Sequence, residues 1–175
     1  MKRIFALLLC ALMIASFLAA CQGNDNSAQE SKKKKIELTV PYTYSGVSLM
    51  LPTGFYTQSG DGYAAARVRG SNDNVVFMEV EADKAENYTD EDIENSIKVR
   101  LGNDSFKAVN IERRKTDGID TFVIKGTFEQ KKQTCKFIEI CVFLPDRSVI
   151  INYTMMTDTY SEAFEKSAES IRIIK

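Results

Sequence analysis

The side chains that could do chemistry in this sequence are four cysteines and several acidic clusters, because the chain contains no histidine. Without histidine, a Ser-His-Asp triad, a Cys-His pair and most zinc sites are absent. The glycine-rich phosphate-binding motifs are also absent. The chemistry that remains is thiol chemistry, acid and base work by paired carboxylates, and calcium ligation by oxygen atoms.

The densest acidic cluster is the run TDEDIEN, which contains Asp90, Glu91, Asp92 and Glu94. Paired carboxylates can act as general acid and general base. Acidic residues in the first turn of a helix also complement the helix dipole and stay hydrated, and we favour that interpretation. We therefore predict no catalytic residue in this cluster.

Two short loops carry oxygen atoms that could bind calcium, QSGDGY at 58–63 and SNDNV at 71–75. Neither loop matches the spacing of an EF-hand. Turn formation explains the same residues, with Gly60 and Gly62 supplying positive φ angles. We predict no metal site and no cofactor.

Cys135 and Cys141 belong to one strand-like run, TCKFIEICVF. Six residues at about 3.3 Å each place the two sulfur atoms roughly 20 Å apart, so they do not pair with each other. A functional thiol here would take part in redox chemistry or bind a metal, but neither a CxxC spacing nor a histidine supports that interpretation. We expect two buried, reduced, structural cysteines beside Phe137 and Phe143.

Cys21 stands at the end of a secretory signal. Lys2 and Arg3 begin the chain, an almost unbroken apolar stretch covers 4–18, and small alanines precede the cysteine. The tetrapeptide LAAC at 18–21 resembles the lipobox of bacterial lipoproteins, in which the thiol receives a diacylglycerol and the chain is cut before the cysteine. We predict a signal peptide over 1–20 and lipidation of Cys21. The alternative is an uncleaved transmembrane helix, which needs roughly 20 apolar residues.

The segment after Cys21 is polar and includes four consecutive lysines, Lys32 to Lys35. Residues 21–35 therefore read as the lipidated cysteine and a flexible tether, with a root-mean-square reach of about 20 Å. The lysines either contact anionic lipid or act as a solubilising spacer. The implied location is the cell membrane, lipid-anchored on its extracytoplasmic side.

Residues 36–175 form one domain of ordinary size. They carry 17 basic and 22 acidic side chains, a net charge of −5. A nucleic-acid-binding domain would present a basic face, so we expect no nucleic acid partner.

Short β-rich segments punctuated by turn residues run through most of the domain. Two opening strands are predicted at 36–40 and 47–52, followed by a hairpin of 63–69 and 75–81. Four further strands, separated by short turns, indicate an antiparallel meander over 107–154. The third of these is apolar on both faces, so both sides of the sheet need cover.

Two helices are predicted. Thr89 and Asp92 form a capping box before a helix at about 90–101. A C-terminal helix follows an Asp158 cap, and one apolar stripe of that helix contains Tyr160, Phe164, Ala168 and Ile171. Helices of this kind would pack on the sheet.

The chain resembles the PsbP/DcrB-like domains found on many bacterial lipoproteins. The resemblance rests on SGVSLMLPTGFYTQ with its Pro-x-Gly-aromatic turn, on DGIDTFVIKGTF and IEICVFLPDRSVIINYT, and on the closing FEKSAESIRII, and it covers roughly 45–174. It implies an α+β fold, a central antiparallel meander sheet flanked by helices in an α/β/α sandwich. Photosystem members support a manganese and calcium site partly through histidine, and this chain has none.

The resemblance implies no conserved enzymatic chemistry, because members of the family serve as accessory and scaffold modules or have no assigned role. We therefore expect a non-catalytic envelope lipoprotein that is anchored to the membrane and binds or scaffolds an unknown envelope protein or ligand. Two alternatives remain open. One is a carrier with an apolar cavity between helix and sheet, and the other is an envelope enzyme with converging carboxylates.

Overall fold

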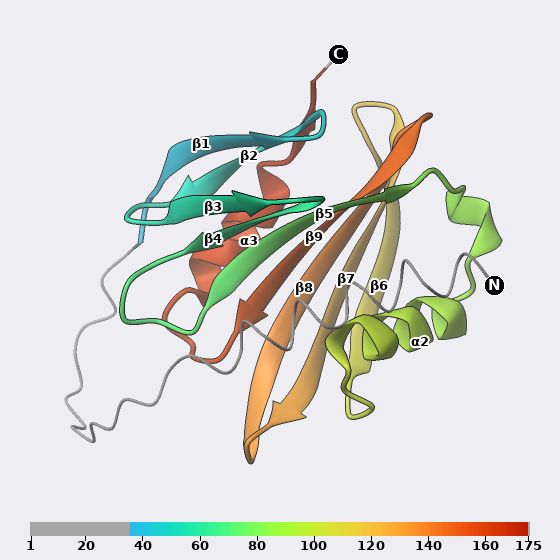
Figure 1. Ribbon diagram of the computed structural model, residues 1–175. Helices are drawn as coiled ribbons and strands as arrows, with labels where there is room; N and C mark the ends of the chain where they lie inside the picture. The colour runs from blue at the N-terminus through green and yellow to red at the C-terminus, as the bar shows by residue number, and fades with distance from the viewer. Residues whose placement is uncertain (1–35, 175) are drawn as a thin grey trace.

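The computed structural model describes residues 36–174 (Figure 1). Cys21, the predicted signal peptide at 1–20 and the predicted tether at 21–35 lie outside the described residues. The elements in chain order are β1 (Leu38–Tyr44), β2 (Val47–Pro52), β3 (Tyr56–Gly60), β4 (Tyr63–Arg67), β5 (Asn74–Glu81), the 3-10 helix η1 (Ala85–Asn87), α2 (Asp90–Leu101), β6 (Lys107–Thr116), β7 (Ile119–Gln130), β8 (Gln133–Phe143), β9 (Arg147–Met155), α3 (Ser161–Glu169) and β10 (Arg172–Ile173).

The centre of the fold is a seven-stranded antiparallel sheet with the order β3-β4-β5-β9-β8-β7-β6. Strands β6 to β9 are the predicted meander, and β4 and β5 are the predicted hairpin. β5 pairs with β9, which joins the first half of the domain to the meander. The α+β class and the central antiparallel sheet are confirmed.

Both faces of this sheet are covered, as the two-faced apolar pattern of β8 requires. Figure 1 shows α2 in front of the sheet and α3 behind it. One core lies on the α3 side and includes Phe77, Ile140, Tyr153 and Phe164. The other lies on the α2 side and includes Ile97. The result is the predicted sandwich, with helices against both sides of the sheet.

The opening strands do not join the central sheet. β1 and β2 pair with each other, and β2 also pairs with the two-residue strand β10, in a separate sheet of order β1-β2-β10. This small sheet helps α3 cover the sheet face. Strand β3 was not predicted, because its five residues are all exposed and show no apolar alternation.

Local capping determines where α2 begins and ends. The Thr89 hydroxyl accepts from the Asp92 N–H at 3.2 Å, and Asp92 accepts from the Thr89 N–H at 3.0 Å. This is the predicted capping box, and the helix ends at Gly102, whose φ of 59° is left-handed.

Capping of α3 differs from the prediction. The helix begins after Tyr160, and the Asp158 side chain does not cap it. That carboxylate instead accepts from Lys136 Nζ on β8 at 2.6 Å, a cross-element ion pair that local sequence does not reveal. The prediction of an Asp158 cap is therefore wrong. The helix also ends at Glu169, so Ile171 lies beyond it, and only Phe164, Ala168 and Ile171 of the predicted stripe are fully buried.

Candidate functional site

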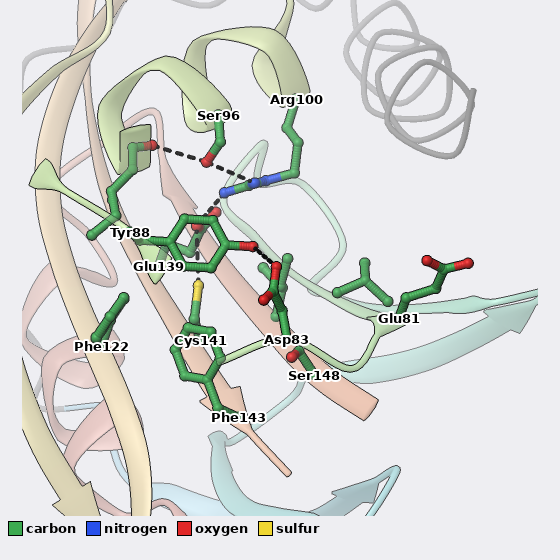
Figure 2. Close-up of a pocket in the computed structure, with 13 residues that line it drawn as sticks. Glu81, Asp83, Tyr88, Ser96, Arg100, Phe122, Glu139, Cys141, Phe143 and Ser148 are labelled. Atoms are coloured by element: carbon green, nitrogen blue, oxygen red, sulfur yellow. Dashed lines mark hydrogen bonds and ion pairs between the residues drawn. The ribbon is translucent and has the colours of Figure 1, made fainter. Parts of the chain in front are cut away.

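A partly enclosed pocket lies between α2, the segment around η1, and the α2 side of the sheet (Figure 2). Its free volume is about 60 Å³. The lining side chains are Val80, Glu81, Asp83, Tyr88, Ile93, Ser96, Arg100, Phe122, Glu139, Cys141, Phe143, Ser148 and Ile150. A space of this size admits about four to six water-sized groups, whereas pockets for drug-sized ligands have about 300 to 1,000 Å³.

A buried ion pair closes the inner end of the pocket. Arg100 and Glu139 are 6% and 1% exposed, and the guanidinium donates to Glu139 Oε1. Arg100 is held inward because it follows Ile93 and Ile97 on the buried stripe of α2. Arg100 also donates to the Ser96 hydroxyl at 3.1 Å. The ion pair links the helix to the middle of the sheet.

Neither member of this ion pair was predicted. Both could have been noticed in the sequence, because each is a charged residue at a position where the local pattern predicts an apolar side chain. Glu139 alternates with Cys135, Phe137 and Cys141 on the α2 face of β8, and Arg100 lies seven residues after Ile93. A charge at such a position needs a buried partner, but its identity is not local information.

Cys141 lies in the pocket wall, and the two cysteines differ in burial. Cys135 is fully buried as predicted, whereas Cys141 is only half-buried. The prediction that both are buried is therefore wrong for Cys141, which keeps part of its surface accessible because it lines the pocket. The Cys141 sulfur points inward to Glu139 Oε1 at 3.4 Å. Desolvation and the neighbouring carboxylate raise the pKa of this thiol well above its ordinary value.

Asp83 and Tyr88 form the outer wall. The Tyr88 hydroxyl donates to Asp83 Oδ2 at 2.7 Å, and desolvation together with this carboxylate raises the pKa of Tyr88 to about 12. Asn87 Nδ2 donates to Asp83 Oδ1 at 2.6 Å, so this aspartate also organises η1. Arg113 on β6 donates to the Tyr88 carbonyl at 3.1 Å. These contacts hold the aromatic ring over the pocket.

Two buried oxygen atoms of the pocket have no hydrogen-bond partner among the residues that the structure describes. They are Glu139 Oε2 and Ser148 Oγ, on side chains that are 1% and 4% exposed. A buried polar group without a partner is unfavourable by about 1 to 3 kcal/mol unless water or a ligand satisfies it. The pocket therefore offers open hydrogen-bond acceptors at two places.

The acidic cluster TDEDIEN has structural partners. Asp90 pairs with Arg113, Asp92 belongs to the capping box, and Glu94 accepts from Lys98 Nζ at 2.7 Å and from the Ala108 N–H at 3.0 Å. These contacts attach the start of α2 to β6. The cluster has a structural role at the start of the helix, and Ile93 is the one residue of this run that lines the pocket.

The two loops whose oxygen atoms could bind calcium, at 58–63 and 71–75, have different structural roles. In SNDNV, Asp73 is fully buried and accepts from the N–H groups of Met156 and Thr157, at 2.7 and 3.1 Å, and from the Thr157 hydroxyl. In QSGDGY, Gly62 has the expected positive φ but Gly60 does not, because Gly60 ends β3. Within residues 36–174, no group of three or more His, Cys, Asp or Glu side chains is arranged to hold a metal ion.

Neither a protein-family model nor a curated protein matches this chain. Solved structures do. The cyanobacterial PsbP (CyanoP) from Synechocystis sp. PCC 6803 aligns with a TM-score of 0.56 at 13% identity, covering 85% of this chain and 98% of that one. This likeness shows that the fold is PsbP-like, as the sequence resemblance implied.

Two further solved structures give lower scores. LpqN, described as involved in cell envelope biogenesis of Mycobacterium tuberculosis, has a TM-score of 0.48 at 13% identity over 81% of this chain and 93% of its own. PA94 from Pseudomonas aeruginosa, a protein of unknown function and putative regulator, has a TM-score of 0.46 at 10% identity over 75% of this chain and 94% of its own. The described helices include none long and apolar enough to cross a membrane.

Proposed function

We infer that this protein is a non-catalytic module of the bacterial cell envelope, anchored to the membrane through a lipid on Cys21, which binds or scaffolds another envelope component. The observation that carries the non-catalytic part is the state of the pocket. Its buried carboxylate is committed to an ion pair with Arg100, and its thiol has a raised pKa. A nucleophile and a base held in this way are poorly suited to catalysis.

The anchor is supported by the sequence alone. The signal layout of 1–20, the LAAC motif at Cys21 and the polar segment to Lys35 form a continuous series of features. Two or three acyl chains bind a bilayer stably, because each buried CH₂ contributes about 0.8 kcal/mol. The domain would then stand on a tether on the extracytoplasmic side.

A second candidate is a carrier for a small ligand, and a specific observation favours it over an enzyme. The pocket lies between helix and sheet, where such a cavity was expected, and it has mainly apolar walls with two unused acceptors. Its free volume of about 60 Å³ restricts any such ligand to a few heavy atoms.

The anchor is tested by Cys21→Ser, with Cys135→Ser as the matched control. We expect Cys21→Ser to abolish metabolic labelling by palmitate and to leave the precursor unprocessed, while the control is labelled and cleaved normally. Palmitate labelling that survives Cys21→Ser would contradict the anchor. Crosslinking in intact membranes followed by purification would then identify the bound envelope component.

A further inference from the structure

We propose that the pocket between α2 and the sheet is a binding site for a short linear diamine, a molecule with an ammonium group at each end of an apolar chain. The inference rests on the proposed function only in treating this pocket as a binding site and not a catalytic one. It adds the chemical class of the ligand.

The charge of the pocket favours a cation. Three carboxylates line it, those of Glu81, Asp83 and Glu139, against the single guanidinium of Arg100. The only thiol and the only phenol of the lining are Cys141 and Tyr88, and both are neutral at physiological pH. A site lined by an excess of one charge attracts ligands of the opposite charge.

The open acceptors define the two ends of the ligand. At the inner end, Arg100 and Cys141 both use Glu139 Oε1, so Oε2 is left to accept from a ligand. At the outer end, Ser148 Oγ has no partner in the described chain, and Figure 2 shows the Asp83 side chain beside Ser148. An ammonium group is a donor only, so it fits both ends.

The middle of the pocket is apolar. Phe122 and Ile150 both pair with Cys141, which lies midway along β8 between Glu139 and the level of Ser148. Val80 and Phe143 flank Ser148 itself, so a hydrocarbon chain would be desolvated along this path without losing hydrogen bonds. Figure 2 shows Phe143 and Cys141 along the floor and the Tyr88 ring above them. A chain with polar atoms in its middle would lose hydrogen bonds to water in this section without replacing them.

Strand register sets the length. Ser148 pairs with Phe143, which is four residues along β8 from Glu139, so the two ends are about 13 Å apart along the strand. A diamine with four carbons spans about 6 Å between nitrogen atoms, and a hydrogen bond of about 3 Å at each end brings the total to about 12 Å. Its six heavy atoms also match the free volume, which admits about four to six water-sized groups.

The first experiment is isothermal titration calorimetry of the full chain, purified from membranes in detergent, with 1,4-diaminobutane. Butylamine and 1,4-butanediol are the matched ligands with one ammonium group and with none. We expect the diamine to bind, butylamine to bind at least about tenfold more weakly, and the diol not to bind. Equal heats for all three, or none, would overturn the proposal and leave a pocket filled by water only.

Diamine binding to single-residue variants then tests whether the ligand binds in this pocket. Ser148→Ala should weaken diamine binding about tenfold, because it removes one charge-assisted hydrogen bond, and Glu139→Gln should weaken it at least as much. Glu86→Gln removes a carboxylate from η1 outside the pocket and should change the affinity less than about twofold. Unchanged binding in Ser148→Ala would show that the diamine binds elsewhere.

A thiol measurement tests the site without any variant. Cys141 lines the pocket and Cys135 does not, so bound diamine should slow modification of Cys141 by a small neutral thiol reagent and leave Cys135 unaffected. Calorimetric binding without this protection would contradict the proposed site. The anchor is judged separately, since lost palmitate labelling concerns Cys21 and lost diamine binding concerns only the pocket.

Discussion

At the scale of single residues, the notable feature is a charged pair in the interior. Arg100 and Glu139 lie 39 residues apart in sequence and are almost completely buried against each other. A buried pair gains little over apolar residues of similar volume, because desolvation offsets most of the attraction. Removing only one member of the pair is strongly destabilising, because the other charge then stays buried without a compensating partner.

We predict that Arg100→Met or Glu139→Gln alone lowers the free energy of unfolding by about 3 to 5 kcal/mol, and that the double variant Arg100→Met with Glu139→Leu recovers most of that loss. Urea unfolding followed by far-UV circular dichroism measures all three. The exposed pair of Lys115 and Asp120 is the control, and its removal should change stability by less than about 1 kcal/mol. Additive losses in the double variant would show that the two charges are not coupled.

The two thiols give a prediction about pH. Burial raises the pKa of Cys135, and burial together with Glu139 raises that of Cys141 well above the ordinary value of 9.0. Because only the thiolate reacts, modification of the native protein by a polar reagent should be slow at neutral pH, and the rate should still be rising with pH at 9.0. Peptide mass spectrometry at each pH separates the two residues. A rate for either residue that levels off near neutral pH would contradict the assignment.

At the scale of elements, α3 is the helix that closes the apolar face of the sheet. Phe164 is fully buried. Its ring centroid lies 5.6, 5.3 and 5.9 Å from those of Phe55, Tyr153 and Tyr160, respectively. Glu165, the next residue, is half-exposed and pairs with Lys125 on β7 at 2.5 Å. Adjacent positions on one helix therefore have very different energetic roles.

We predict that Phe164→Ala lowers the free energy of unfolding by about 3 to 5 kcal/mol, because a sheet cannot collapse into the cavity that the ring leaves. Glu165→Ala is the matched control and should cost less than about 1 kcal/mol, since its ion pair is largely exposed. Both are measured by urea unfolding. Small and equal effects would mean that α3 is not docked on the sheet in solution.

At the scale of the whole molecule, one sheet separates two apolar cores. Phe164 lies in the core on the α3 side and Ile97 in the core on the α2 side. Strands β7, β8 and β9 supply residues to the sheet between them, so neither core can persist when those strands separate. The two cores are distinct in space but belong to one folding unit.

We predict that Ile97→Ala costs about 2 to 5 kcal/mol and that its effect adds to that of Phe164→Ala within about 0.5 kcal/mol. Unfolding should remain a single transition. Because the chain contains no tryptophan, the fluorescence of its seven tyrosines, which include Tyr153 in the α3-side core and Tyr88 beside the α2-side core, is compared with far-UV circular dichroism. Two separated transitions would show that the cores unfold independently.

The sequence by itself determined the parts of this protein that depend on near neighbours. The bounds of α2 followed from a capping box and a left-handed glycine, and the meander followed from alternation and turn residues. The predicted anchor at Cys21 rests in the same way on a short local motif. Near neighbours in the chain act whatever the rest of the fold does, so their patterns can be interpreted directly.

Only the tertiary structure decided which distant segments meet. It joined β10 to β2, gave Asp158 to Lys136 in place of the α3 cap, and brought Arg100 against Glu139. The pocket, with half-buried Cys141 in its wall, exists only because α2 packs against the sheet face that carries Glu139 and Cys141. Each of these contacts joins residues that are more than 20 positions apart in the sequence. Many residues of the right type could in principle form each contact, so local sequence does not identify the partner.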